Sequence, residues 1–244
     1  MNPAQLINDG ALVVSNNSGG KDSQAMLAIL RQMVPDKKNL LVIHANLSGA
    51  EWSGTEQHAK DFSSGLEFIT VKSKKTFEDM VRHRGMFPSP KYRQCTSDLK
   101  RAPIQKAIRH HCKDHGYNLV LNCMGIRAEE SPGRKKMQAF KLNKSMSNKK
   151  RTVYDWFPIF DYTTRQVFDT IENAGQKPHE VYAQGISRLS CAICIMSSKA
   201  DLQKVAKIWP EQFEKYARLE REIGHTVMMP RKGHPALGLY DYIK

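Results

Sequence analysis

A turn of small residues between an apolar run and a helical pattern constrains this chain more than any other feature. Residues 11–15 can form a buried strand, and residues 24–33 carry apolar side chains at helical spacing. Small residues let backbone N–H groups surround an anion, and the N-terminus of the following helix is positively polarised. The sequence therefore predicts a phosphate-binding turn, which consists of Ser18, Gly19, Gly20, Lys21, Asp22 and Ser23.

The side chains of this turn separate it from two common nucleotide-binding motifs. The P-loop places a hydroxyl directly after its lysine, where this chain has Asp22, and the Gly-x-Gly-x-x-Gly spacing is not met. We expect Lys21 to contact the β- and γ-phosphates of a nucleotide, with Ser18 and Ser23 as hydroxyl donors. Two roles stay open for Asp22, which are orienting Mg²⁺ and capping the helix N-terminus. A turn that binds no ligand is the alternative to all of these roles.

Strands and helices alternate along the first two thirds of the chain. Apolar runs at residues 39–44, 66–71 and 118–124 predict further strands, with helical patterns between them. The alternation predicts an α/β fold, a parallel twisted sheet with helices on both faces. Ligands bind such sheets beyond the carboxyl ends of the strands, where the turn at 18–23 and the loop at 45–55 both belong.

The character of the sequence changes toward its C-terminal end. Residues 1–175 are predicted to form the nucleotide-binding α/β domain, and residues 176–244 a small, mainly helical part that carries Cys191 and Cys194. A break in the last helical pattern is expected at Pro210. The helical patterns cover residues 55–64, 76–84, 102–115, 163–174 and 201–223.

The chain has a net charge of +14, from 38 Lys and Arg residues against 24 Asp and Glu residues. Such an excess attracts polyanions such as ATP or nucleic acid, with solubility alone as the alternative explanation. Residues 135–151 contain seven Lys or Arg residues and little periodicity, so we expect a mobile basic segment there. No apolar run reaches the about 18 residues of a membrane span, and no signal-peptide pattern is present. We therefore expect a cytoplasmic protein without a membrane partner.

Five cysteines, an odd number, argue against a disulfide framework. Cys191 and Cys194 have a spacing typical of zinc or iron–sulfur ligands, and Cys95 supplies a third thiol. A fourth ligand would have to be Cys112, Cys123 or a histidine, and Cys123 lies in a predicted buried strand, where an apolar role is favoured. A bound cluster, a redox or sulfur-relay pair and inert thiols all stay open.

The six residues at 18–23 resemble the PP-loop of the ATP pyrophosphatase superfamily, and a longer pattern over residues 10–225 is similar to the phosphoadenosine phosphosulfate reductase (PAPS reductase) family. The resemblance implies an adenine nucleotide alpha hydrolase-like fold that cleaves ATP between its α- and β-phosphates. It also implies that His44 and Gly125 belong to the nucleotide site and that Arg127 pairs with phosphate oxygens. A salt bridge from Arg127 to Glu129 or Glu130 is the alternative. The matching residues are Ser18–Ser23, His44–Gly49, Cys95, Lys100, Arg101, Gly125–Arg127, Ser131, Trp156–Ile159 and Gly185–Cys194.

The chain departs from the reductases in its cysteines. Iron–sulfur members carry a Cys-Cys pair where this chain has Cys95 alone, and the reductases attack their substrate with a cysteine near the C-terminus, whereas residues 195–244 contain none. Without that thiolate the reductase intermediate cannot form. The chain looks most like the ATP pyrophosphatase subunits of bacterial DNA phosphorothioation systems, of the Dnd and Ssp types.

This resemblance implies an enzyme that uses ATP and Mg²⁺ to adenylylate a DNA backbone phosphate for sulfur insertion. It further implies a sulfur-donor partner such as a cysteine desulfurase. Two alternatives stay open, which are a PAPS reductase-like enzyme that acts on a small sulfonucleotide with a thiol from elsewhere, and a nucleic-acid-binding module that retains a nucleotide pocket. Both a monomer and a homodimer stay open.

Overall fold

A computed structural model of the chain describes residues 1–189, 191–230 and 233–244. Contacts within the chain group the residues into two compact units. Unit 1 consists of residues 1–45, 54–71 and 103–179, and unit 2 of residues 46–53, 72–102 and 180–244. Residues 46–53 and 72–102 thus belong with the C-terminal segment. The division into domains at residue 175 stays a prediction.

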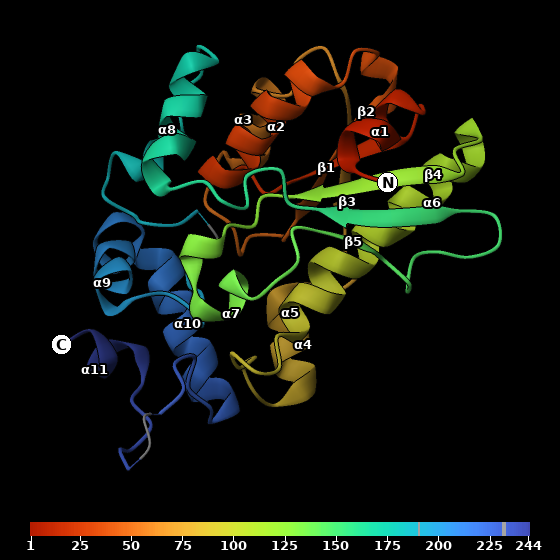
Figure 1. Cartoon of the computed structure of the whole chain (residues 1–244). Coiled ribbons are helices and arrows are strands. Elements are labelled where there is room, and N and C mark those ends of the chain that lie inside the picture. Colours follow the sequence, from red (N-terminus) through yellow and green to blue (C-terminus); the bar gives the residue numbers. More distant parts are fainter. Residues whose placement is uncertain (190, 231–232) are drawn as a thin grey trace. The chain divides into compact units, whose positions relative to one another are not determined.

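The core of unit 1 is a six-stranded sheet with the strand order β3-β2-β1-β4-β6-β5 (Figure 1). β1 pairs in parallel with β2 and β4, β4 pairs in parallel with β6, and β5 pairs with β6 in the antiparallel direction. The predicted α/β fold with a mostly parallel sheet is therefore confirmed. The strands are β1 Leu12–Asn17, β2 Leu40–Asn46, β3 Glu67–Lys72, β4 Leu119–Met124, β5 Phe140–Leu142 and β6 Thr152–Trp156.

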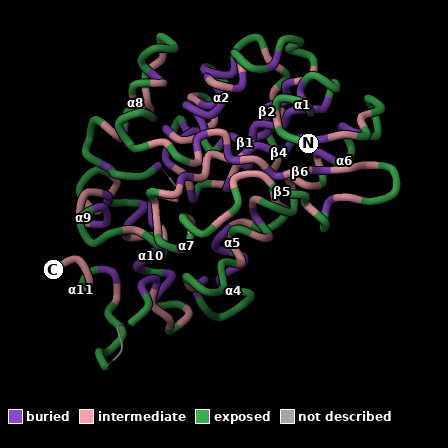
Figure 2. The backbone as a smooth tube through the Cα atoms, in the orientation of Figure 1, coloured by how far each residue is buried: buried purple, intermediate pink, exposed green. Residues whose placement is uncertain are grey.

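Helices cover both faces of this sheet because successive residues of a buried strand point to opposite faces. Val13 packs with side chains of α1, α2, α3 and α8 on one face, whereas Leu12 and Val14 pack with α6 on the other. Figure 2 shows the central strands as almost continuously buried. The helices of unit 1 are α1 Pro3–Asn8, α2 Lys21–Met33, α3 Thr55–Asp61, α6 Ala102–His115, α7 Pro132–Lys135 and α8 Thr164–Asn173.

A row of polar side chains crosses the α6 face of the sheet toward the carboxyl ends of its strands. Asn16 of β1 donates to the side-chain oxygen of Asn122 of β4 at 2.7 Å. Asn122 in turn donates to Asp155 of β6 at 2.7 Å, and Asn143 donates to both oxygens of Asp155 at 3.0 and 3.1 Å. Asn122 and Asp155 are buried, and these hydrogen bonds compensate their burial.

The sequence predicted a mobile basic segment with little periodicity at residues 135–151. Part of this segment instead forms a strand. The middle of the segment forms β5, which runs antiparallel to β6 with Phe140 opposite Trp156 and Leu142 opposite Tyr154. β6 is parallel to β1, so Trp156 and Phe140 lie at the carboxyl edge of the sheet. The connection at 143–151 consequently lies at the opposite, amino edge (Figure 1).

Unit 2 is mainly helical and has its own apolar core. Phe213 and Tyr216 of α10 are at most 1% exposed, and the Tyr216 ring stacks on Phe77 of α4 at 5.5 Å between centroids. Pro210 begins α10, which confirms the predicted break. No helix among the described residues is long and apolar enough to cross a membrane. The helices of unit 2 are α4 Phe77–Arg84, α5 Gln94–Thr96 with the π-helical Ser97–Arg101, α9 Lys199–Ile208, α10 Pro210–Ile223 and α11 Leu239–Ile243.

Asp201, in the first turn of α9, fixes the loop before that helix. Its two carboxylate oxygens accept from the backbone N–H and the hydroxyl of Ser187, at 3.1 and 2.6 Å. Burial raises the pKa of Asp201, but hydrogen bonds from Ser187 and Ser198 outweigh burial and hold it below its ordinary 3.8. The ionised carboxylate is therefore the form that stabilises the fold.

Replacing this carboxylate gives a pH-dependent test. Asp201→Asn should lower the free energy of unfolding by roughly 1–3 kcal/mol near neutral pH, because a charged hydrogen-bond acceptor is lost. Because the pKa of Asp201 is lower in the folded state, its ionised carboxylate stabilises the fold fully at a pH above its ordinary pKa of 3.8. This stabilisation disappears as the pH falls through the folded-state pKa. Urea unfolding across this range should show the difference from wild type shrinking in acid. Asp241→Asn, at a side chain 61% exposed, is the control and should change little at any pH.

Candidate functional site

The candidate site lies where the strand order of unit 1 reverses. β1 is central, with β2 on one side and β4 on the other, and ligands of such sheets bind beyond the carboxyl ends at this position. The turn at 18–20 leaves the carboxyl end of β1, and the loop at 125–127 leaves that of β4. The structure thus brings together two segments that are separated by about a hundred residues in the sequence.

Hydrogen bonds fix the shape of the turn after β1. The side-chain oxygen of Asn17 accepts from the backbone N–H of Gly19 at 2.9 Å and lies 3.1 Å from the Ser23 hydroxyl. The Ser23 hydroxyl also accepts from the N–H of Ser18 at 3.2 Å. Gly19 has a φ of +74°, in the left-handed region that glycine tolerates. The sequence analysis missed Asn17, although an amide at the end of an apolar strand directly before a glycine turn is a usable signal.

The N-terminus of α2 faces this turn without a side-chain cap. Gly20 is the N-cap residue and can supply no capping oxygen, so the capping role left open for Asp22 is wrong. Uncapped N–H groups at the start of a 13-residue helix favour the binding of an anion. Lys21 is the first residue of the helix and is 5% exposed. Ser18, Gly19, Gly20, Lys21 and Ser23 thus lie together in the turn and in the first turn of α2, and their contact with a phosphate stays a prediction.

Three predicted catalytic residues meet in a network of charges. Asp22 accepts from the Nε of Arg127 at 2.6 Å through Oδ1, and its Oδ2 lies 3.2 Å from the Nζ of Lys21. Both carboxylate oxygens of Asp22 are consequently engaged with cations. The network connects the turn after β1 with the loop after β4.

Arg127 is held by several acceptors and is 3% exposed. Besides Asp22, its guanidinium donates to Glu129, to the carbonyl of Tyr162 at 3.2 Å and to the Thr164 hydroxyl at 3.2 Å. The alternative salt bridge to Glu129 is thus present, and it lowers the pKa of Glu129, together with hydrogen bonds from Thr164. Contact of Arg127 with phosphate oxygens stays a prediction.

His44 and Gly125 support the turn in different ways. His44 has no exposed surface, and its Nδ1 lies 2.9 Å from the carbonyl oxygen of Asn17. It therefore acts on the turn through β1, and its direct contact with a nucleotide stays a prediction. A Cβ on Gly125 would come within 2.9 Å of the Asp22 carbonyl and 3.0 Å of the Ser23 nitrogen, so only glycine lets the two loops approach this closely.

The three predicted metal ligands lie in unit 2. Cys95, Cys191 and Cys194 come from two segments and pack against the same apolar cluster. Burial raises the pKa of Cys95, and burial together with the neighbouring thiols raises that of Cys191 to about 12, with Lys100 acting in the opposite direction. Cys112 and Cys123 are instead buried in the two cores of unit 1, which confirms the apolar role predicted for Cys123.

The spacing of these thiols limits which metal group they fit. Sulfur ligands of a single zinc ion lie about 3.8 Å apart, given Zn–S bonds of about 2.3 Å. Within the part of the chain that the structure describes, the three thiols do not form a group with all ligand atoms within 4.8 Å. Three soft sulfur donors are the ligand type of thiolate-bound metal groups such as an iron–sulfur cluster, and a bound cluster stays a prediction.

The close approach at Gly125 leads to a test of the site's architecture. Gly125→Ala should destabilise unit 1 by about 1–3 kcal/mol, because the added methyl group meets backbone atoms that cannot rotate away. Gly133→Ala is the control, since its Cβ would meet only the Ser131 hydroxyl oxygen at 4.0 Å. Calorimetric melting of both variants measures the difference. Equal melting temperatures for the two would contradict the packing described here.

Comparisons with known proteins find relatives that match most of this chain. An uncharacterized 37.8 kDa protein in the gpa 5' region of Escherichia phage 186 is 30% identical over 186 residues, which are 74% of this chain and 54% of that protein. An uncharacterized protein of Methanocaldococcus jannaschii is 24% identical over 209 residues, 85% of this chain and 47% of that protein. This chain therefore spans about half the length of these curated relatives.

Similarity extends to solved structures and to a defined family. The crystal structure of phosphoadenylyl-sulfate (PAPS) reductase from Candida auris, in a phosphate complex, is 14% identical, with a TM-score of 0.49 and coverage of 78% of this chain and 88% of that chain. Residues 12–197 match the phosphoadenosine phosphosulfate reductase domain, a range that includes both loops of the site and most of the chain. The chain belongs to the phosphoadenosine phosphosulfate reductase domain family.

Proposed function

We propose that this chain binds ATP at the turn after β1, cleaves it between the α- and β-phosphates and transfers AMP to an acceptor phosphate. The observation that carries the proposal is the uncapped N-terminus of α2 beside Lys21, where the strand order reverses. An anion site of this kind binds the phosphates of a nucleotide. Membership of a family named for an enzyme that uses an adenine nucleotide supports the same ligand class.

The reaction is a displacement at the α-phosphorus. An oxygen of the acceptor forms a bond to this phosphorus, the bond to the bridging oxygen breaks, and pyrophosphate leaves with the electron pair. No electron is gained or lost overall, so the protein needs only to bind and stabilise charge. Backbone N–H groups of α2 and the ammonium of Lys21 stabilise the negative charge that develops on the pyrophosphate.

Asp22 and Arg127 have positioning roles in this proposal. Asp22 holds Lys21 near the turn, and Arg127 holds Asp22 from the loop after β4. Both oxygens of Asp22 contact these cations, and a role of Asp22 in orienting Mg²⁺ stays a prediction. No step depends on the ion here, and a magnesium ion would be bound mainly by the nucleotide phosphates and water.

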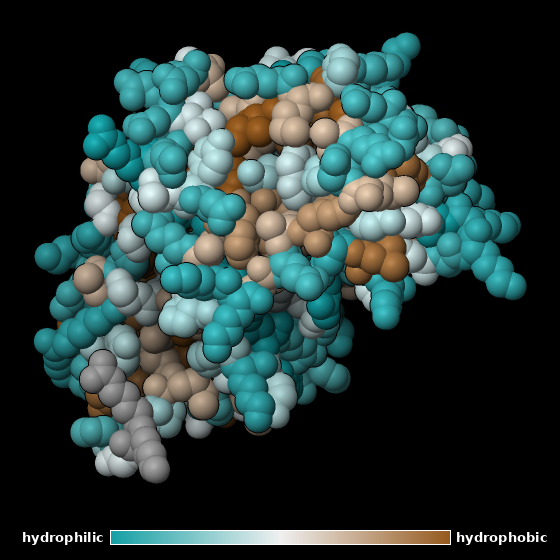
Figure 3. All heavy atoms as spheres, in the orientation of Figure 1, coloured by the Kyte–Doolittle hydropathy of each residue, from teal (hydrophilic) through white to brown (hydrophobic). Residues whose placement is uncertain are grey.

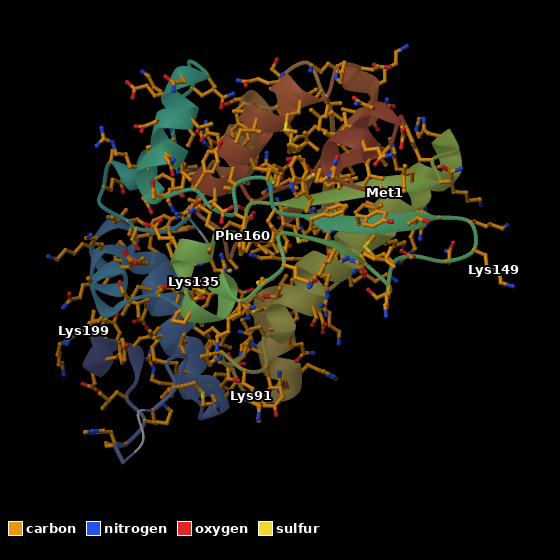
Figure 4. The ribbon with its side chains drawn as sticks, viewed as in Figure 1. Met1, Lys91, Lys135, Lys149, Phe160 and Lys199 are labelled. Carbon is orange, nitrogen blue, oxygen red and sulfur yellow. The ribbon has the colours of Figure 1, made fainter. Side chains whose placement is uncertain are left out.

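We further propose that the acceptor is a DNA backbone phosphate and that a desulfurase-type partner donates sulfur to it. The net charge of +14 supports a polyanionic acceptor. Two exposed lysines, Lys135 and Lys136, end α7 and precede β5, at the carboxyl edge of the sheet where the nucleotide turn lies. Lys149 lies at the opposite, amino edge of the sheet, as Figure 4 shows. The surface around this edge is hydrophilic in Figure 3.

The second candidate function is a PAPS reductase-like reaction on a small sulfonucleotide. The family match favours it, whereas the lack of cysteine in residues 195–244 requires a thiol from elsewhere. In either function, Cys95, Cys191 and Cys194 would hold an iron–sulfur cluster. Bound there, such a cluster would supply a redox centre and tie together the two segments that carry the thiols.

The products of ATP cleavage test the leading proposal. ATP labelled at the γ-phosphate should yield labelled pyrophosphate, whereas labelled orthophosphate would contradict it. Lys21→Ala should lower the rate by about 10²–10³, the usual effect of removing one group that stabilises developing charge. Lys113→Ala, at an exposed lysine on α6, is the matched control and should turn over at the wild-type rate. Circular dichroism should show that both variants are folded.

The two pairs of lysines lie at opposite edges of the sheet, so substituting each pair separately tests where DNA binds. The logarithm of the DNA association constant should fall steeply with the logarithm of salt concentration, because each neutralised phosphate releases counterions. Lys135→Ser with Lys136→Ser should reduce this slope by about 2, the amount expected for two lost phosphate contacts. Lys149→Ser with Lys150→Ser should leave it nearly unchanged, since these residues lie at the amino edge.

The same measurements can exclude DNA as the acceptor while leaving the proposed ATP cleavage intact. Undetectable or salt-insensitive DNA binding, with pyrophosphate release intact, would exclude DNA as the acceptor and favour the reductase-like candidate. Equal effects of the two lysine pairs would show that DNA binding is not organised around the carboxyl edge.

A further inference from the structure

A second cluster of potential ligands lies in unit 1, away from the nucleotide turn. His111 and His115 are four residues apart on α6, so their side chains share one face of the helix. Glu67, the first residue of β3, lies beside them. One ring nitrogen of each histidine and one carboxylate oxygen of Glu67 all lie within 4.8 Å of one another.

Packing holds the central histidine of this cluster in place. His111 is 6% exposed, and its ring stacks on His115 at 4.3 Å and on Tyr117 at 5.9 Å between centroids. The Tyr117 hydroxyl donates to the side-chain oxygen of Asn39 at 2.8 Å, which fixes the tyrosine in turn. Glu67 and His115 are exposed, so an ion can reach the cluster from solvent.

The distances suit a divalent transition metal ion. The Nδ1 of His111 lies 3.4 Å from the Oε1 of Glu67. Two ligand atoms at about 2.0–2.2 Å from a tetrahedral zinc ion lie about 3.4 Å apart. The exposed His115 offers the third ligand atom, within 4.8 Å of the other two. Two imidazoles and one carboxylate favour zinc and its neighbours over Ca²⁺ or Mg²⁺, which prefer oxygen ligands alone.

We propose that Glu67, His111 and His115 bind a divalent transition metal ion such as Zn²⁺, with water at the remaining position. Metal binding requires a neutral imidazole. Burial lowers the pKa of His111, with the charge of Glu67 acting in the opposite direction, so burial favours the neutral ring.

The position of this site indicates what a bound ion would do. Glu67 begins β3, an edge strand of the sheet, and His115 ends α6, which is followed by the amino end of β4. The site therefore lies at the amino edge of the sheet, whereas the nucleotide turn lies at the carboxyl edge. A metal ion would connect the edge strand to the helix that covers one face, and would stabilise unit 1 without entering the reaction at the nucleotide turn. The inference is independent of the proposed function.

Zinc binding to the purified, tag-free chain tests the site through stability. Zinc at about a hundredfold excess over its dissociation constant should raise the melting temperature of the chain by about 5–10 °C. Glu67→Gln and His115→Ala should each remove most of this rise, and both replace exposed side chains, so they should fold without metal. His110→Ala removes an exposed neighbour on α6 that is not in the cluster and should keep the full rise.

The cysteines of unit 2 could bind zinc as well, so the metal environment has to be identified. Cobalt(II) bound by thiolates gives intense sulfur-to-metal charge-transfer absorbance, whereas cobalt(II) bound by nitrogen and oxygen gives only weak bands. The weak bands should appear in Cys191→Ser and disappear in His115→Ala. Zinc that leaves the melting temperature unchanged, or a rise that survives in His115→Ala and is lost in Cys191→Ser, would overturn the proposal.

Discussion

The ion pair between Asp22 and Arg127 is the interaction on which the candidate site depends. It joins the first turn of α2 to the loop after β4, across the position where the strand order reverses. Because Arg127 also bonds Glu129 and the start of α8, the pair ties three elements to one buried guanidinium. A charge buried with this many acceptors is stable only while all of them stay in place. The geometry of the phosphate site is therefore set by contacts outside the turn itself.

Much of the fold could be predicted from local pattern. Apolar runs located the strands within about two residues of the observed β1 to β4. The helical pattern at 163–174 likewise located α8, which begins after the capping box of Thr163. These features depend on neighbouring residues and so leave a local signal. The turn at 18–23 was predicted for the same reason, because its small residues are consecutive in the sequence.

The features that escaped prediction depend on distant partners. β5 has only three residues and forms because β6 offers an unpaired edge, which no pattern within residues 135–151 reveals. The contacts of Arg127 with Tyr162 and Thr164 were not predicted, because these acceptors lie more than thirty residues away in the sequence. The grouping of residues 46–53 and 72–102 with the C-terminal segment likewise arises from contacts that are long-range in sequence.

The polar row across β1, β4 and β6 affects how these strands find their pairing. Alternating apolar residues exclude a slip by one residue, since every side chain would change face, but a slip by two keeps each face apolar. Asn122 and Asp155 restrict such a slip between β4 and β6, because a shift by two residues would move Asp155 away from Asn122 and would break the hydrogen bond between these two buried side chains. This hydrogen bond thus favours one register of β6 against β4, the strand whose carboxyl end carries the loop at 125–127.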